Sequence, residues 1–301
     1  RLMKILLFGK NGQVGWELQR SLAPLGELVA LDFDSPDLCG DFMCPDGIAD
    51  TVRAIAPDVI VNAAAHTAVD KAESEPDGVR TINALAPATL AREACELNAL
   101  LVHYSTDYVF NGSGSKPWVE TDLVGPLSVY GSTKLEGEEA IFASGCHHLI
   151  FRTSWVFATR GGNFAKTMLR LGQERDQLTV IDDQVGAPTG ADLLADVTAH
   201  AIRAALQQQS LSGLYHLVAS GETSWYGYAR FVLNLARQAG VSLKAAPESV
   251  LPISTSAFPL PARRPKNSRL DTTKLQRTFD LCLPPWQIGV ERMITETLDK
   301  L

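Results

Sequence analysis

The first half of the chain alternates short apolar runs with amphipathic stretches, the pattern of strands and helices that follow one another. The apolar runs predict strands at residues 3–8, 28–31, 59–62, 100–105 and 149–153. The amphipathic stretches predict helices at residues 14–22, 46–55, 79–98 (despite Pro87) and 130–144. Strands that are apolar along their whole length suit a sheet buried on both faces. We therefore predict an α/β fold with a doubly wound parallel sheet.

The second half has a more mixed pattern. Residues 192–207 and 225–240 predict helices, and residues 215–218 predict a strand. Residues 247–265 are rich in proline and serine and predict an irregular segment. We expect a smaller α/β domain interleaved with the first one, with a ligand cleft between them. The predicted division is 1–156 with 190–222 for the first domain and 157–189 with 223–301 for the second.

Composition excludes several classes of protein. The chain has 301 residues, of which 46% are hydrophobic, enough for a large core. A net charge of −7 disfavours nucleic-acid binding, which usually needs a basic surface. No apolar run is long enough to span a bilayer. Five scattered cysteines without a Cys-x-x-Cys pair indicate reduced thiols in a cytoplasmic protein and disfavour a zinc site.

A glycine-rich loop joins the first predicted strand to the first predicted helix. Gly9, Gly12 and Gly15 would allow a tight turn, close approach of a pyrophosphate, and close packing of helix on strand. The helix N-terminus then offers N–H groups to phosphate. The spacing is Gly-x-x-Gly-x-x-Gly, so an ordinary glycine-rich turn is the alternative. The context favours a dinucleotide and a Rossmann-type sheet.

Two further strand ends suit the same ligand. Asp32 ends the second predicted strand, where an acid can bond the adenosine ribose. The next three residues include no Arg or Lys, which favours NADH over NADPH. After the third predicted strand, residues 62–65 read Asn-Ala-Ala-Ala, small enough for backbone to lie against a cofactor. His66 follows them, and a lone loop histidine is more often structural than a base.

Tyr130 and Lys134 carry the candidate chemistry. Four residues apart on a helix, they share one face. The ammonium is expected to lower the pKa of the tyrosine and to fit it for proton transfer to a carbonyl oxygen. Thr106, at the end of the fourth predicted strand, would face the same cleft and donate to that oxygen. Alternatively, Thr106 only caps its own loop.

These motifs together resemble a known superfamily. Residues 9–15, 62–65, 105–110 and 130–134 resemble the extended short-chain dehydrogenases/reductases. Residues 152–157, 182–189 and 264–268 are more specific and resemble the dTDP-4-dehydrorhamnose reductases, so that the resemblance covers nearly the whole chain. It implies reduction of the 4-keto group of dTDP-4-dehydro-β-L-rhamnose by NADPH or NADH. That reaction is the last step of dTDP-L-rhamnose synthesis, which serves lipopolysaccharide O-antigen. The second domain would then bind the nucleotide sugar.

The resemblance also implies roles for individual residues. Tyr130 would protonate the alkoxide, Lys134 would hold the nicotinamide ribose, and Thr106 would polarise the ketone. Asp107 and Trp155 are implied substrate contacts. The residues expected around the cofactor are Gly9, Gly12, Gln13, Val14, Gly15, Asp32, Asp41, Phe42, Ala65, His66, Thr67, Tyr104, Tyr130 and Lys134.

Two charged groups leave alternatives open. A basic cluster either forms a solvated loop or reaches the diphosphate of the substrate, and it consists of Arg263, Arg264, Lys266 and Arg269. Arg264 is our candidate for binding the diphosphate. The resemblance implies a homodimer with Mg²⁺ near its interface. Glu17 and Asp192 are the candidate ligands, and Glu291 is a third. The alternative is that these acids are ordinary exposed charges.

Two other functions compete with the reductase. A nucleotide-sugar dehydratase or epimerase has the same fold, but dehydratases carry an Asp-Glu pair after the catalytic threonine. This chain has Asp107-Tyr108 there. The second alternative is a non-catalytic, NADP-binding regulatory subunit of the methionine adenosyltransferase type. The presence of Thr106, Tyr130 and Lys134 favours an enzyme.

Overall fold

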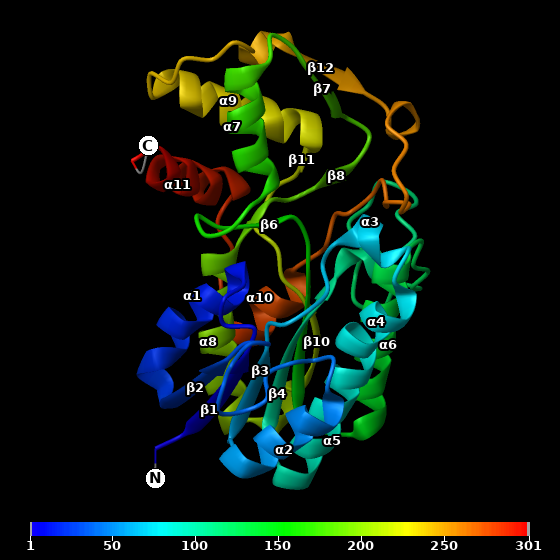
Figure 1. Cartoon of the computed structure of the whole chain (residues 1–301), viewed down its shortest axis with the longest axis vertical. Helices are drawn as coiled ribbons and strands as arrows, with labels where there is room; N and C mark the ends of the chain where they lie inside the picture. The colour runs from blue at the N-terminus through cyan, green and yellow to red at the C-terminus, as the bar shows by residue number, and fades with distance from the viewer. Residues whose placement is uncertain (1, 300–301) are drawn as a thin grey trace.

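A six-stranded, wholly parallel sheet forms the centre of the larger part of the molecule. The computed structural model describes residues 2–299. The strands, in spatial order, are β2 (Glu27–Leu31), β1 (Lys4–Phe8), β3 (Val59–Asn62), β4 (Leu100–Thr106), β5 (His148–Thr153) and β10 (Gly213–His216) (Figure 1). The predicted α/β fold and Rossmann-type parallel sheet are confirmed. The strand predicted at 215–218 begins two residues earlier.

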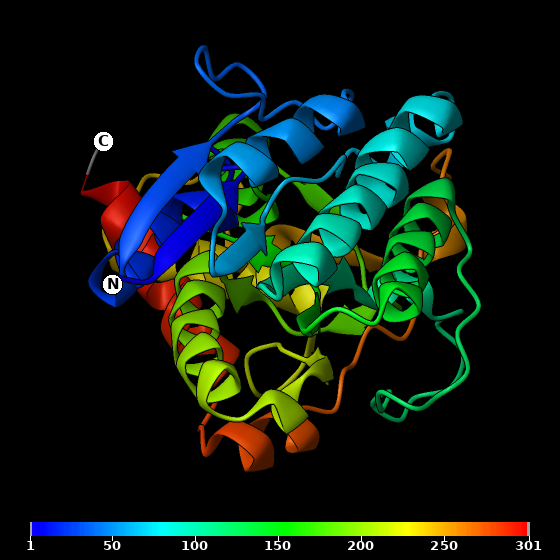
Figure 2. The ribbon, with the colours of Figure 1, turned by 90° about the horizontal axis from the view of Figure 1, so that it is seen from below.

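Helices cover both faces of this sheet because successive strand residues point to opposite sides. Ile5 and Leu7 pack with α1 (Gln13–Leu22) and α8 (Ala191–Gln207). Their neighbours Leu6 and Phe8 instead share a core with the helices of the other face, which are α2 (Pro45–Ile55), α5 (Ala86–Leu97) and α6 (Val129–Ser144). The two helical layers lie on opposite sides of the strands (Figure 2).

The helix predicted at 79–98 is a composite run. It consists of α4 (Pro76–Arg80), a π-helical turn η2 (Thr81–Leu85) and α5. A proline inside a helix lacks its N–H and clashes with the carbonyl four residues back, which for Pro87 is that of Asn83. The wider π turn accommodates this defect. Asn83 lies in this turn, and its side chain contacts His66 in the loop after β3.

A second group of elements has its own core above the sheet (Figure 1). The helices α7 (Phe164–Glu174), α9 (Trp225–Gln238) and α11 (Trp286–Leu298) pack around the strands β7 (Leu178–Ile181) and β12 (Val250–Ile253). The prediction of an irregular segment at 247–265 is wrong at β12, which pairs in parallel with β7. The predicted domain boundaries stay a prediction.

The remaining elements are short. They are η1 (Ala23–Leu25), α3 (Val69–Ala72), η3 (Asp107–Val109), β6 (Val156–Phe157), β8 (Val185–Gly186), β9 (Thr189–Gly190), η4 (Gln209–Leu211), β11 (Thr223–Ser224), η5 (Pro247–Ser249), η6 (Thr255–Ala257) and α10 (Thr273–Phe279). Small two-stranded sheets pair β6 with β9 and β8 with β11. None of the helices in residues 2–299 has the length and apolar character needed to cross a membrane.

Candidate active site

The glycine loop lies at the point where the strand order reverses, between β1 and β3, which is where ligands bind in open parallel sheets. Gly9 has φ +83°, and a Cβ there would meet the backbone of Ala63 at 2.7 Å. A Cβ on Gly15 would lie 1.9 Å from the Gly9 carbonyl oxygen. Gly12 caps α1 without a side-chain hydrogen bond, so the first helical turn keeps donors for an anion. Gly9 and Gly15 thus have the turn and packing roles predicted from the sequence, and the pyrophosphate role stays a prediction.

A cavity of about 480 Å³ opens beside this loop. Its lining consists of Gly9, Gly12, Asp32, Phe33, Gly40, Asp41, Phe42, Met43, Ala63, Ala64, Ala65 and Ile82. No Lys or Arg is among these lining residues. The Asp32 carboxylate accepts from the backbone N–H groups of Asn11 (2.9 Å) and Phe33 (2.8 Å), which fixes it at the cavity wall. The size and the glycine cradle fit a dinucleotide.

The other predicted cofactor residues surround the same region in different ways. Asp41 accepts from the Met43 N–H at 2.9 Å, and Phe42 packs edge-on against Phe8. The Gln13 Oε1 atom is buried without a hydrogen-bond partner among the described residues. Val14, next to it, packs against the core beside α1. A buried polar atom without a partner is expected where a ligand completes the site.

Asn83 positions the segment after β3, and no sequence pattern predicts this role. Its Oδ1 accepts from the His66 N–H at 2.9 Å, and its Nδ2 donates to the His66 carbonyl at 3.1 Å. His66 is therefore held through its backbone, and its buried ring Nδ1 has no hydrogen-bond partner within residues 2–299. Thr67 follows as an exposed residue that does not line the cavity. The side chain of Asn83 reaches this loop from the π turn.

Tyr130 and Thr106 come together as predicted. Ser128 caps α6 by accepting from the Gly131 N–H at 3.1 Å, which starts the helix one residue before Tyr130. The Thr106 hydroxyl lies within hydrogen-bonding reach of the Tyr130 phenol. Thr106 Oγ1 also accepts from the Tyr108 N–H at 3.1 Å. Thr106 therefore caps η3 and also reaches the phenol. Its role at a substrate carbonyl stays a prediction.

The predicted effect of Lys134 on Tyr130 is wrong. The Lys134 ammonium donates to the Tyr104 carbonyl at 2.5 Å, and burial lowers the pKa of Lys134 to about 8. Burial raises the pKa of Tyr130 to about 12, while the hydrogen bond from Thr106 opposes that rise. The low dielectric of the site therefore outweighs any nearby charge. Tyr130 is protonated at neutral pH, which is the state that a proton donor needs.

Tyr104 contributes only its backbone to this cluster. Its phenol lies 2.6 Å from the Thr198 hydroxyl in the core beneath α8. Its carbonyl, as the acceptor for Lys134, faces α6. Any cofactor contact of Tyr104 is therefore restricted to main-chain atoms.

Trp155 has an unusual backbone. Its φ is +50°, rare for a large side chain and often found at ligand sites. The indole stacks on Trp225 with ring centroids 3.7 Å apart. Trp225 is fixed in turn by a 3.1 Å hydrogen bond from its Nε1 to Gln184. Asp107, the other implied substrate contact, is 1% exposed.

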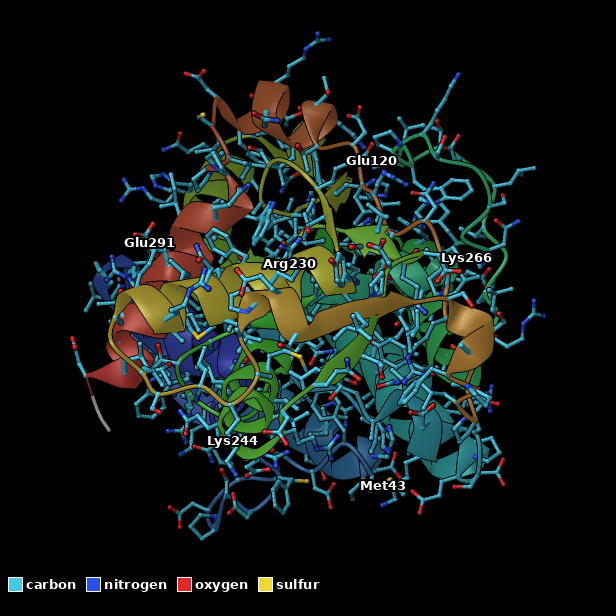
Figure 3. All side chains as sticks on the ribbon, turned by 90° about the horizontal axis from the view of Figure 1, so that it is seen from above. Met43, Glu120, Arg230, Lys244, Lys266 and Glu291 are labelled. Atoms are coloured by element: carbon cyan, nitrogen blue, oxygen red, sulfur yellow. The ribbon has the colours of Figure 1, made fainter. Side chains whose placement is uncertain are left out.

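A second cavity, of about 390 Å³, lies beside the basic cluster. Its lining includes Phe258, Arg263, Arg264 and Lys266. Arg264 is already bound bidentately to Asp70, at 2.9 and 2.8 Å. Lys266, labelled in Figure 3, pairs with Asp183 at 3.0 Å, and Arg269 pairs with Glu222 at 2.8 Å. Within residues 2–299, Arg263 is the member of the cluster without a carboxylate partner.

The predicted magnesium ligands do not form a complete site in one chain. Glu17 and Asp192 line a common cavity of about 220 Å³, together with Arg20, Asp196, Arg292 and Glu296. Glu17 is paired with Arg20 at 3.1 Å. Glu291 lies exposed on α11 and does not line this cavity (Figure 3). No group of three His, Cys, Asp or Glu side chains in the described part of the chain is arranged for a metal.

The dinucleotide cradle at the switch point, with the Thr106–Tyr130–Lys134 cluster beside it, defines an oxidoreductase of the short-chain dehydrogenase/reductase type. Comparison with known proteins narrows this class. A family model described as "RmlD substrate binding domain" matches residues 3–298. A dTDP-4-dehydrorhamnose reductase of Escherichia coli (strain K12) is 62% identical over 294 residues, which cover 98% of each chain.

Solved structures agree with this comparison. A dTDP-4-dehydrorhamnose reductase from Clostridium acetobutylicum ATCC 824 matches with a TM-score of 0.87 at 36% identity, covering 99% of this chain and 100% of that chain. One from Bacillus anthracis str. Ames, solved in complex with NADP, matches with a TM-score of 0.86 at 33% identity and the same coverage. The chain belongs to the dTDP-4-dehydrorhamnose reductase family, as its motifs predicted.

Proposed function

We propose that this chain reduces the 4-keto group of dTDP-4-dehydro-β-L-rhamnose to give dTDP-β-L-rhamnose, with NADPH or NADH as reductant. Family membership supports the substrate, because the relatives at 62% identity extend over nearly the whole chain. The observation that carries the chemistry is the hydrogen bond between Thr106 and a protonated Tyr130. The reaction would complete dTDP-L-rhamnose synthesis.

Each residue of the cluster has a distinct task in this proposal. The bound nicotinamide supplies the hydride. Thr106 donates a hydrogen bond to the ketone oxygen and stabilises the negative charge that develops there. Tyr130 gives its proton to that oxygen. Lys134 stays charged below a pH of about 8 and donates to the Tyr104 carbonyl on β4. The nicotinamide ribose would lie beside this contact.

The cofactor would occupy the cavity beside the glycine loop. Gly9, Gly12 and the start of α1 would hold the pyrophosphate, and Asp32 would accept from the adenosine ribose. The absence of Lys and Arg from the cavity lining supports use of NADH, and the NADP-bound relative supports use of NADPH. We propose that the chain accepts both.

The nucleotide part of the substrate would occupy the second cavity. Arg263 is exposed, lines this cavity and has no carboxylate partner in residues 2–299, which suits a diphosphate. Arg264 lines it too, but Asp70 already occupies its guanidinium. The stacked Trp155 would present an apolar face to the sugar.

A homodimer with bound Mg²⁺ in the cytoplasm stays part of the proposal. Because one chain lacks a complete ligand set, the ion would need oxygen ligands from a second copy as well. We therefore expect EDTA to lower the dimer mass measured by light scattering, and added Mg²⁺ to restore it. A mass that changes with neither EDTA nor Mg²⁺ would count against a metal-bridged dimer.

The two competing functions find less support. The residue after Asp107 is Tyr108, so the Asp-Glu pair of the dehydratases is absent. A purely regulatory subunit would have no need of a buried Lys134 and a Thr106–Tyr130 contact.

One assay separates these functions. Loss of nicotinamide absorbance on addition of dTDP-4-dehydrorhamnose is expected from the wild-type protein. The Tyr130→Phe variant should bind NADPH normally but lose about 10²- to 10⁴-fold in kcat, because the phenolic proton is missing. Near-normal turnover of this variant would remove Tyr130 as the donor. A wild type that binds NADPH without oxidising it would favour the regulatory alternative.

A further inference from the structure

Asp107 is a buried acid directly behind the proposed proton donor. It is 1% exposed, and none of the ion pairs in residues 2–299 includes it. Its Oδ1 lies 3.3 Å from Thr106 Oγ1, and its buried Oδ2 has no hydrogen-bond partner in the part of the chain that the structure describes. The Ser268 hydroxyl and the backbone N–H of Asp107 itself are further polar neighbours of the carboxyl group. Because Thr106 also bonds Tyr130, the three side chains form one chain of hydrogen-bonding groups.

The surroundings of Asp107 favour its neutral form. An isolated carboxylate that is removed from water is strongly disfavoured unless a cation or several donors compensate it. Tyr108 on η3 and Tyr130 on α6 interact with its charge. The cations of the site are Lys134 on α6 and Arg264, which interacts with Tyr108. Lys134 is bonded to the Tyr104 carbonyl and Arg264 to Asp70, so neither compensates the carboxylate. Burial accordingly raises the pKa of Asp107 to about 7.

We propose that Asp107 stores the proton that restores Tyr130 after each reduction, with the Thr106 hydroxyl as the relay. This role rests on the proposed function, in which Tyr130 ends each turnover as a phenolate. The Thr106 hydroxyl gives its proton to the Tyr130 oxygen and takes another from Asp107 Oδ1. The phenol is regenerated, a carboxylate remains, and the number of protons is conserved. Asp107 recovers its proton from water when the site opens for product release.

The relay makes a kinetic prediction that a simple substrate contact does not make. Asp107→Asn keeps the shape but cannot deliver a proton. With excess NADPH and dTDP-4-dehydrorhamnose, stopped-flow absorbance should show a rapid burst of one NADPH oxidised per active site. Steady turnover should then be at least about 100-fold slower than in the wild type, the low end of typical acid–base contributions. The wild type should show no burst.

The outcomes of this experiment are distinct. If the first turnover slows as much as the steady state, Asp107 contributes to binding or hydride transfer only, and the relay is wrong. Unchanged steady turnover also overturns it. If the wild type itself fails to oxidise NADPH, it is the reductase function that fails.

A second variant tests the relay without removing the acid. The Ser268 hydroxyl lowers the pKa of Asp107, so Ser268→Ala should raise that pKa and move the alkaline fall of kcat to higher pH. In Asp107→Asn, this limb of the kcat profile should disappear. If kcat falls at the same alkaline pH in both variants as in the wild type, the relay is contradicted. The Ser268→Ala result decides this even if Asp107→Asn folds poorly.

Discussion

At the scale of single residues, side-chain direction decides the chemistry. The spacing of Tyr130 and Lys134 places both on one helix face, yet the lysine donates to the Tyr104 carbonyl on β4. The expected lowering of the tyrosine pKa therefore does not occur, and burial raises it instead. Sequence spacing gives the face of a helix but not the partner that a long, flexible side chain selects.

The two neighbouring arginines should respond differently to truncation. Arg263→Ala should raise KM for the nucleotide sugar by about tenfold or more, because a charge-assisted hydrogen bond is worth about 1.5–3 kcal/mol. Its unfolding temperature should not change, since Arg263 is exposed and forms no ion pair with the residues that the structure describes. Steady-state kinetics and a thermal melt measure both effects.

Arg264→Ala is the matched control. It removes the bidentate contact to Asp70 and should therefore lower the unfolding temperature, as should Asp70→Ala. If Arg264→Ala raises KM while Arg263→Ala does not, Arg264 binds the diphosphate, as the sequence predicts. The proposal that Arg263 binds it is then wrong.

At the scale of elements, the start of α6 packs closely against η3, and Gly131 is the residue at the contact. A Cβ on Gly131 would lie 2.3 Å from the Tyr108 carbonyl oxygen. This contact holds α6 against η3, which brings Tyr130 to within 5.7 Å of Tyr108, ring to ring. The sequence shows the glycine but not the carbonyl that requires it.

Gly131→Ala should therefore destabilise the protein by about 1–3 kcal/mol, the usual effect of overpacking. Because the helix must shift, kcat should fall as well. Gly78→Ala in α4 is the control, since no atom lies within 4 Å of its added Cβ. That variant should be neutral or more stable by up to about 1 kcal/mol. Urea unfolding of the two variants tests the difference, and equal stabilities would contradict the close approach.

The sequence pattern did not predict the strand β12, because of a proline within it. Its sequence, Val-Leu-Pro-Ile, contains Pro252, and proline within a run argues against a central strand. In the structure β12 belongs to a two-stranded sheet, where a proline need not take part in the ladder. Only the packing of Val250 in the core of α7, α9 and α11 identifies the segment as structured.

At the scale of the whole molecule, the buried Asp107 couples folding to pH. Its pKa rises from 3.8 to about 7 on folding, so the folded state binds the extra proton between these values. This stabilisation is fully present below pH 3.8 and is lost as the pH rises through 7. The whole effect is roughly 4 kcal/mol, at 1.36 kcal/mol per pKa unit.

Asp107→Asn should remove this dependence. Compared at about pH 3.5, below the unfolded-state pKa of 3.8, the variant and the wild type should differ little beyond the effect of the amide itself. Compared at pH 8, the variant should gain stability relative to the wild type, because the wild type then buries an unpaired charge. Thermal melts across this range give the difference, and a constant gap between the two proteins would contradict a raised pKa.

The sequence by itself determined the order of strands and helices, the glycine cradle and the set Thr106, Tyr130 and Lys134. These follow from periodicity and from residues whose chemistry is local. Only the tertiary structure decided that Asn83 holds the loop at His66, that Asp70 occupies Arg264, and that Asp107 lies behind Thr106. Such contacts join distant elements, or depend on how deeply a group is buried, and burial is a property of the whole fold.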